Sequence, residues 1–145
     1  RIKDWWGGKL IIKGIMDPDD AKMAQKCGAD ALVVSNHGGR QLDGVNSSIS
    51  MLPQIKKAIS GIEVLFDGGI SSGQDILKAI ALGAEGVMIG RSFVYGLSAK
   101  GKKGVKNALE ILNKELDMTM ALCGRRDIND VGRDIIKDCP FFEKN

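Results

Sequence analysis

The chain repeats one pattern four times: a short apolar run, then glycine or polar residues, then a segment in which apolar side chains recur at helical spacing. The apolar runs span residues 10–12, 31–34, 64–66 and 86–89. They are continuously apolar rather than alternating, which is typical of parallel strands covered on both faces. The pattern therefore predicts an α/β chain of four consecutive βα units.

Helices are expected between and after these runs. Asp17 followed by Pro18 favours a helix start, and Gly28 favours the end of the same helix. A second helix is expected within residues 47–59, with Pro53 restricting its regular part to the second half. Further helices are expected at 72–82, at 92–99 and from 104 to about 122.

Length, charge and cysteine content limit the class of protein. The 145 residues, 43% of them apolar, suit one globular domain, and the net charge of +3 comes from scattered basic residues. Nucleic acid is therefore not an expected partner. The cysteines Cys27, Cys123 and Cys139 lack metal-ligand spacing and suit plain thiols in a reducing compartment. No apolar run approaches the roughly 20 residues that span a bilayer. Neither a membrane span nor a signal peptide is therefore expected from these residues. Because the first residue is Arg1, we expect the written sequence not to begin at a natural start.

Four βα units can build an open doubly wound sheet or part of a closed (β/α)8 barrel. Both folds place functional groups at the C-terminal ends of strands, and every apolar run here is followed by such groups. A barrel typically needs about 250 residues and often binds phosphate after its last two strands. If 67–73 and 90–91 form that phosphate site, the four units are the C-terminal half of a (β/α)8 TIM barrel. The strand-end groups are Lys13, Ser35 with His37, Asp67 with Gly68 and Gly69, and Gly90 with Arg91.

The run Ser35-Asn36-His37-Gly38-Gly39-Arg40 has the composition of an active-site loop. His37, the single histidine, can accept and return a proton near neutral pH. Arg40 offers a planar cation that suits a carboxylate or phosphate. We therefore expect chemistry beside a carboxylate.

Structural roles compete with the functional ones for the other strand-end groups. Taken alone, Lys13 is explained by a solvated lysine, and residues 67–69 by a simple turn. Arg91 alone is explained by a helix cap or a surface ion pair. Asp43 is expected to order the loop after Arg40. Trp5 and Trp6 precede the first strand, away from the expected active face, and are expected to serve packing or to be a scar of truncation.

The chain resembles the C-terminal half of the FMN-dependent 2-hydroxy acid oxidising family, which includes L-lactate dehydrogenase, glycolate oxidase and lactate oxidase. The resemblance covers residues 8–136, and its most specific element is the run Val-Ser-Asn-His-Gly-Gly-Arg-Gln-Leu-Asp at 34–43. Supporting elements are Ile-Lys-Gly at 12–14, Asp-Gly-Gly-Ile at 67–70, Ala-Leu-Gly-Ala at 81–84 and Ile-Gly-Arg at 89–91. The last three also resemble other phosphate-binding barrels, such as inosine monophosphate dehydrogenases.

The resemblance implies a role for each strand-end group. It makes His37 the catalytic base, Arg40 the residue that grips the substrate carboxylate, and Lys13 the cation at the N1 and O2 edge of the flavin. Ser35 is implied to contact the flavin. The implied ribityl and phosphate site consists of Asp67, Gly68, Gly69, Ile70, Ser71, Gly90 and Arg91.

Two departures from the family pattern bear on the site. The family usually carries an arginine on the FMN phosphate where this chain has Ser71, so weaker phosphate binding is expected; proline is common where Asn46 stands. The carboxylate that orients the histidine would belong to the other half of the barrel, and a histidine without that partner loses much of its catalytic power. We therefore expect this polypeptide alone to have little or no activity.

The resulting expectation is an FMN-dependent oxidoreductase segment acting on a small L-2-hydroxy acid, with L-lactate as the first candidate. Residues 1–145 would form a partial FMN hydroxy acid dehydrogenase domain, the second half of the barrel plus C-terminal helices. Its expected partners are the substrate, an N-terminal half-barrel if that is separately encoded, and a second copy if the chain forms homo-oligomers. The alternative is a non-catalytic phosphate-binding half-barrel or a nonfunctional remnant. A cytoplasmic location is expected, free or at the inner face of the membrane.

Overall fold

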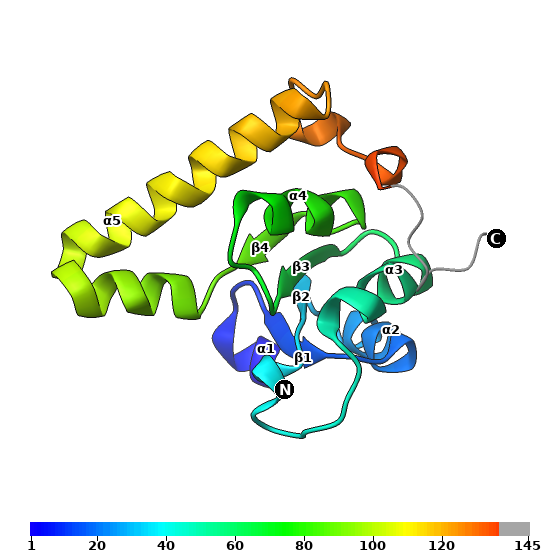
Figure 1. Cartoon of the computed structure of the whole chain (residues 1–145). Helices are drawn as coiled ribbons and strands as arrows, with labels where there is room; N and C mark the ends of the chain where they lie inside the picture. The colour runs from blue at the N-terminus through cyan, green and yellow to red at the C-terminus, as the bar shows by residue number, and fades with distance from the viewer. Residues whose placement is uncertain (137–145) are drawn as a thin grey trace.

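The structure, a computed structural model, describes residues 1–136 and shows strands alternating with helices (Figure 1). The strands are β1 (Ile11–Ile15), β2 (Ala31–Val34), β3 (Glu63–Asp67) and β4 (Gly86–Met88). The α-helices are α1 (Ile2–Trp6), α2 (Pro18–Lys26), α3 (Ser48–Ala58), α4 (Gly73–Ala81) and α5 (Arg91–Leu122). Short 3-10 helices lie at η1 (His37–Gly39), η2 (Ile128–Asp130) and η3 (Arg133–Ile135). The predicted order of βα units is confirmed.

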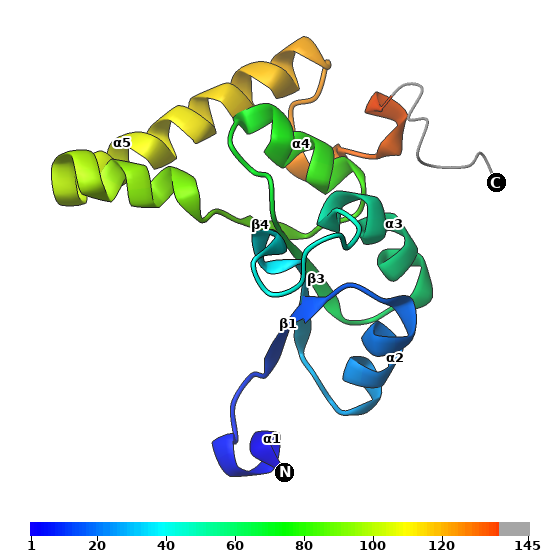
Figure 2. The same ribbon diagram turned by 60° about the horizontal axis from the view of Figure 1, so that its bottom comes forward.

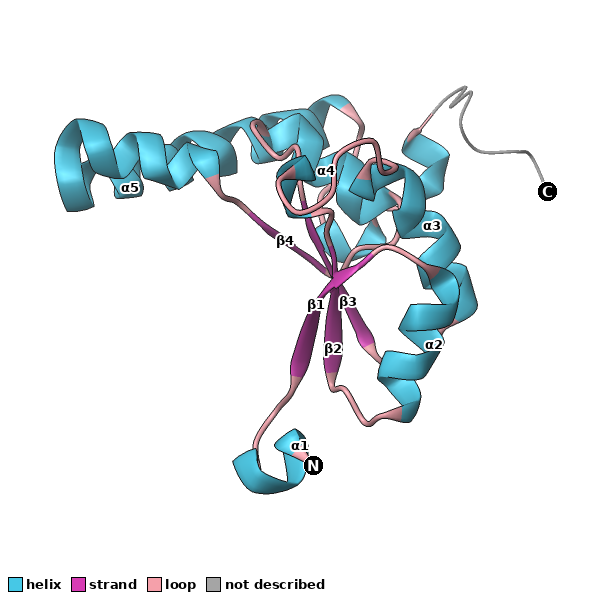
Figure 3. Cartoon of the chain, turned by 90° about the horizontal axis from the view of Figure 1, so that it is seen from below, coloured by secondary structure: helices cyan, strands magenta, loops and turns pink. Residues whose placement is uncertain are grey.

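The strands form one parallel sheet in the order β1-β2-β3-β4. Leu32 pairs in register with Val64, and Val34 with Phe66. Side chains alternate along a strand, so these four lie on the same face of the sheet. All four are at most 1% exposed, and they pack in one core with residues of α2, α3 and α4. Figure 3 shows α2 and α3 together on that side of the strands.

The opposite face of the sheet is only partly covered. The alternation places Ile11, Leu65 and Met88 there, and Ile11 and Met88 are 52% and 41% exposed. Leu65 is half-buried. The expectation of strands covered on both faces therefore holds for β2, whose residues are all buried, and not for the outer strands within residues 1–136.

The helix boundaries follow local capping chemistry. The Asp17 side chain accepts a hydrogen bond of 2.7 Å from the backbone N–H of Asp19 and so caps α2, as predicted. Ser72 and Asp75 form a reciprocal capping box at the start of α4. The prediction that Pro53 restricts the regular helix to the second half of 47–59 is wrong, because α3 begins at Ser48 and continues through Pro53. Proline removes one backbone hydrogen bond there, and burial of Leu52 and other residues of the helix offsets that loss.

Helix α5 consists of two arms that meet at a sharp turn (Figure 1). The backbone leaves helical geometry at Lys100 and Gly101, so the arms correspond to the two helices predicted there. Gly96 and Gly104 bring the arms into contact: a Cβ atom on Gly104 would lie 1.8 Å from the carbonyl oxygen of Gly96. Only glycine allows so close an approach of the two backbones.

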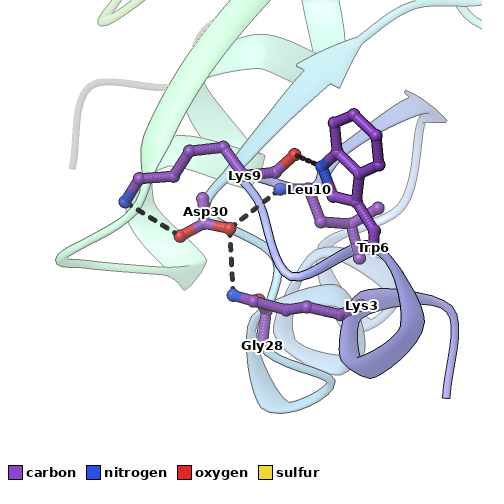
Figure 4. Close-up of polar contacts among 6 residues, drawn as sticks. All are labelled: Lys3, Trp6, Lys9, Leu10, Gly28 and Asp30. Carbon is purple, nitrogen blue, oxygen red and sulfur yellow. Dashed lines mark hydrogen bonds and ion pairs between the residues drawn. The ribbon is translucent and has the colours of Figure 1, made fainter.

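Asp30 ties the N-terminal segment to the sheet (Figure 4). One carboxylate oxygen accepts hydrogen bonds of 2.9 Å from the Lys3 ammonium and from the backbone N–H of Leu10. The other accepts from the Lys9 ammonium at 3.1 Å. The hydrogen bond from Leu10, followed by those from the two lysines, holds the pKa of Asp30 well below its usual range. The ionised form of Asp30 is therefore favoured by the fold.

Replacing Asp30 by Asn is expected to lower the melting temperature at neutral pH, because the neutral Asn side chain cannot form an ion pair with Lys3 or Lys9. A carboxyl group with a lowered pKa stabilises the fold above its unfolded pKa of about 3.9 and loses that effect as the pH falls toward the folded value. The difference in melting temperature between Asp30→Asn and the parent should therefore become smaller below about pH 4. This difference is measured by thermal unfolding, monitored by circular dichroism, at several pH values. Asp117→Asn, on the exposed face of α5, is the matched control; a gap independent of pH would contradict the assignment.

The tryptophans do not pack in the core. Trp5 and Trp6 are 74% and 69% exposed in α1, and the Trp6 indole N–H donates to the carbonyl oxygen of Lys9 at 3.2 Å. The expectation that they serve packing is therefore wrong within the described residues 1–136. Their position away from the C-terminal ends of the strands is as predicted. Among the cysteines, Cys27 and Cys123 are free thiols, as expected, and both are exposed. Cys139 lies outside the described residues.

Candidate active site

The candidate residues gather at the C-terminal edge of the sheet. Lys13 lies in β1, Ser35 directly follows β2, and Asp67 ends β3. The parallel register brings these three positions side by side, since Lys13 pairs with Val33 and the strands share one direction. Figure 2 shows this edge, with the segment that follows β2, at the end of the sheet opposite α1.

Lys13, Ser35 and Asp67 form a closed polar network. The Lys13 ammonium donates to the Ser35 hydroxyl oxygen at 2.9 Å and forms an ion pair of 3.1 Å with one Asp67 oxygen. The Ser35 hydroxyl donates to the other Asp67 oxygen at 3.0 Å. Ser35 is fully buried, whereas Lys13 and Asp67 keep 34% and 26% of their side-chain surface exposed. The network therefore holds a positive charge at a fixed, accessible position.

His37 stands next to this network in the turn η1. Its backbone N–H donates to the Ser35 hydroxyl oxygen at 3.2 Å, which ties the turn to the strand-end network. His37 has φ of 54°, the one positive value found for a non-glycine residue within 1–136. Asn36 supports the turn, because its side-chain oxygen accepts from the backbone N–H of Gly38 at 3.0 Å. The imidazole itself is exposed, as proton exchange with a substrate requires.

Arg40 ends the same turn and carries an exposed guanidinium. Within residues 1–136 the guanidinium makes no hydrogen bond and no ion pair, so it is available to an anion. The segment that follows, residues 41–47, is exposed throughout. There the Asp43 side chain accepts from the backbone N–H of Gly44 at 2.9 Å, which fits the ordering role predicted for it.

The turn after β3 leaves space beside the strand ends. Gly68 and Gly69 have φ of 115° and 76°, and a Cβ atom on Gly69 would have no neighbour within 4 Å. A Cβ atom on Gly68 would lie 2.4 Å from the Ser48 hydroxyl oxygen, so only glycine fits there. The Ile70 side chain is buried in the core, which leaves only its backbone to meet a ligand.

Asp75 occupies the hydrogen-bond donors of Ser71 and Ser72. One carboxylate oxygen accepts from both backbone N–H groups and both hydroxyls, at 2.9 to 3.1 Å. Partial burial acts to raise the pKa of Asp75, but the hydrogen bonds from the two serines outweigh it and hold the pKa below its usual range. A ligand anion at this turn would therefore face a carboxylate.

The start of α5 offers a second set of donors. Gly90 precedes the helix and leaves its first N–H groups without a side-chain cap, and a Cβ atom on Gly90 would meet nothing within 4 Å. Arg91 is exposed at the first helical position. A helix N-terminus with free N–H groups and an adjacent cation suits a phosphate.

These residues fit FMN in most respects. A flavin needs a cation near the pyrimidine edge of its ring, which Lys13 can supply from its fixed position. Its phosphate needs donors, which the start of α5 and Arg91 can supply. The turn at Ser71 fits less well, because it adds no positive charge and Asp75 already takes its donors.

Two residues with clear roles at this edge were not predicted from the sequence. Asn36 supports the His37 turn, and an Asn two residues before a glycine N–H is a recognisable signal for such a turn. Gly14 lies inside β1 against the His37 ring, and a glycine inside a strand is a signal for a bulge. Within residues 1–136 there is no cluster of His, Cys, Asp and Glu that could hold a metal ion, and no helix long and apolar enough to cross a membrane.

Comparisons with known proteins show the family of the chain and agree with its fold. The sequence matches the FMN-dependent dehydrogenase family over residues 1–138. It is 51% identical over 140 residues to L-lactate dehydrogenase of Stenotrophomonas maltophilia, covering 96% of this chain and 37% of that protein. It is 54% identical over 134 residues to L-lactate dehydrogenase of Pectobacterium atrosepticum, covering 92% of this chain and 35% of that protein.

The solved relatives have the same fold. A crystal structure of mandelate oxidase with benzoylformic acid superposes with a TM-score of 0.83 at 48% identity, covering 86% of this chain and 38% of that chain. A variant of mandelate oxidase with an FMN adduct superposes equally well, with a TM-score of 0.83. The chain thus spans little more than a third of the length of these relatives. The chain belongs to the FMN-dependent dehydrogenase family, whose members are oxidoreductases with FMN as cofactor.

Proposed function

We propose that this chain is the C-terminal part of an enzyme that oxidises a small L-2-hydroxy acid to the 2-oxo acid, with L-lactate as substrate and pyruvate as product. The observation that carries the proposal is the Lys13, Ser35 and Asp67 network directly beside the exposed His37. Relatives named L-lactate dehydrogenase and mandelate oxidase support both the reaction class and the acid substrate.

In this proposal the chain's own residues have distinct tasks, which their positions support. The free guanidinium of Arg40 binds the substrate carboxylate and orients the carbon that is oxidised. The His37 imidazole takes up the proton released from the substrate as the carbonyl forms. FMN, when bound, accepts the two electrons that leave the substrate. The Lys13 ammonium, held by Ser35 and Asp67, favours negative charge at the edge of the site.

The cofactor contacts we propose follow the same edge. Lys13 would face the flavin ring, and Ser35, whose side chain is fully buried, would lie behind Lys13 and hold its ammonium group against the flavin edge. The phosphate would lie at the start of α5. The ribityl and phosphate contacts proposed are Asp67, Gly68, Gly69, Ile70, Ser71, Gly90 and Arg91. For Ile70 the contact would come from the backbone, since its side chain is buried.

We further propose that residues 1–145 supply the second half of a (β/α)8 barrel. The four parallel strands carry helices over one face, and the opposite face exposes Ile11 and Met88. In a closed barrel the second face is filled by side chains of the other strands. The first half, joined to this chain or separate, would cover that face and complete the substrate site.

A chimera tests the proposed function. In it, the region of a related L-lactate dehydrogenase that precedes the matched segment is joined to residues 1–145 of this chain. We expect the purified chimera to bind FMN and to reduce an artificial electron acceptor with L-lactate, and the chain alone to show little or no turnover. A chimera that folds and binds FMN but turns over neither L-lactate nor another 2-hydroxy acid would contradict the proposal.

Ser71→Arg in the chimera is expected to tighten FMN binding by roughly tenfold, the effect of about one added charge-assisted hydrogen bond. The new guanidinium would add the positive charge that the turn lacks and would offset the Asp75 carboxylate. Riboflavin, which has no phosphate, should bind equally well to both forms. Flavin fluorescence titration measures both ligands. Ser71→Gln is the uncharged control, and an equal gain for riboflavin would contradict a phosphate contact.

A further inference from the structure

Gly14 interrupts β1 at the edge that carries the candidate site. Lys13 pairs with Val33 and Ile15 pairs with Val34, so Gly14 is one extra residue in the strand, a β-bulge. Its φ of 97° lies in the region that L side chains rarely adopt. Bulges redirect neighbouring side chains and are frequent next to active sites.

The bulge lies against the imidazole ring of His37. A Cβ atom built on Gly14 would be 2.7 Å from His37 Cε1, 3.5 Å from Nε2 and 3.6 Å from Nδ1. The ring thus presents the carbon between its two nitrogens to the space that a side chain at Gly14 would fill. Real Cβ contacts are not found at 2.7 Å, so even a methyl group would force the ring to move.

The His37 ring has little else within residues 1–136 to fix it. Neither ring nitrogen makes a hydrogen bond there, and the side chain is exposed. Its backbone is held at φ of 54° by the Asn36 turn and by the bond to Ser35. This backbone geometry fixes the position of the His37 Cα–Cβ bond. The bulge at Gly14 determines how closely the imidazole ring can approach β1.

We infer that Gly14 is a positioning residue for His37: the side-chain-free bulge in β1 is the surface on which the imidazole rests. The contact stands on geometry alone. Its catalytic consequence rests on the proposed function, in which His37 accepts the substrate proton. The inference explains why a glycine with positive φ directly follows Lys13 and lies against the His37 ring.

Nuclear magnetic resonance of the full chain tests the contact without any need for activity. Because the chain has a single histidine, its imidazole gives one set of ring signals. In the parent we expect a strong nuclear Overhauser effect between the His37 ring proton on Cε1 and a Gly14 α-proton. In Gly14→Ala the ring signals should shift and the effect to the residue 14 α-proton should weaken severalfold.

Gly61→Ala is the matched control, because Gly61 also has a positive φ, 73°, yet a Cβ atom there would meet nothing within 4 Å. It introduces comparable backbone strain without touching His37, and its ring signals should match those of the parent. Absence of the Overhauser effect in the parent would overturn the inference. So would ring signals in Gly14→Ala that match those of the parent.

The chimera provides the second measurement, which also decides the matter if the isolated Gly14→Ala chain does not fold. There we expect Gly14→Ala to lower kcat by about tenfold or more, up to the ~100-fold that a misplacement of about 1 Å can cost. KM and the Kd for FMN should stay within about twofold, because the Lys13 and Arg40 contacts are unchanged. A kcat no lower than that of Gly61→Ala would overturn the inference. The proposed function could fail while the contact between Gly14 and His37 is real. In that case the His37→Gln chimera would retain turnover, and the Overhauser effect between His37 and Gly14 would still be seen in the parent chain.

Discussion

His37→Gln in the chimera is expected to lower the rate of L-lactate oxidation by about 10²- to 10⁴-fold, the range typical for loss of a general base. Gln is similar in size and can hydrogen-bond to the substrate, but it cannot take up the proton. FMN binding should be almost unchanged, because the Lys13, Ser35 and Asp67 network does not use the imidazole. Turnover with an artificial acceptor and flavin fluorescence titration measure the two properties separately.

The control for this prediction is Gln41→Ala, an exposed neighbour in the same loop. It should leave the rate and FMN binding close to those of the parent chimera. If His37→Gln lost less than about tenfold in rate, the loss would be below the range for general base catalysis. His37 would then not be the base, and the proposed assignment would be wrong.

Phe66→Ala is expected to destabilise the isolated chain by about 3–5 kcal/mol, the usual effect of removing a buried phenylalanine ring. Phe66 is 1% exposed in the core between the sheet and the helices. The adjacent residue, Leu65, is half-buried on the opposite face, so Leu65→Ala should cost less than half as much. Urea unfolding of both variants, with linear extrapolation to water, measures the difference. The loss expected for Phe66→Ala is a large fraction of the free energy of unfolding of a typical domain, which is about 5–15 kcal/mol.

The contrast between these neighbours reports on the open face of the sheet. In the chimera, where the first half of the barrel would cover Leu65, the effects of the two substitutions should become more similar. Equal effects in the isolated chain would mean that the second face is already covered in solution, as in a homo-oligomer. That result would contradict an open half-barrel in the isolated chain.

Sequence patterns predicted the βα order well because local chemistry determines it. Three of the apolar runs became strands with boundaries within one residue, and the first became β1, which extends three residues further to Ile15. Asp17 and Ser72 act as caps at the predicted helix starts. Pro53 misled the prediction of α3, since the cost of one hydrogen bond is small beside the burial of a whole helix face. The one-sided cover of the outer strands also could not be predicted, because a continuous apolar run does not show which partner covers each face.

The site shows a similar division. The residue types after each strand, together with the family resemblance, pointed to Lys13, Ser35, His37 and Asp67 individually. Their mutual contacts depend on strand register and on the bulge at Gly14, and neither is encoded in a local pattern. Likewise the substitution at Ser71 is visible in the sequence, but its consequence depends on the Asp75 carboxylate, which only the structure places against it.

The most direct test of the central claim, that this chain carries one half of an FMN site completed by another half-barrel, is a titration with FMN. Flavin fluorescence and absorbance would follow binding to the chain alone and to the chain coexpressed with the N-terminal half of a related L-lactate dehydrogenase. The claim predicts weak or no binding alone, and tight binding with bleaching by L-lactate when the partner is present. No binding in either case would contradict it and would leave a remnant that no longer holds the cofactor.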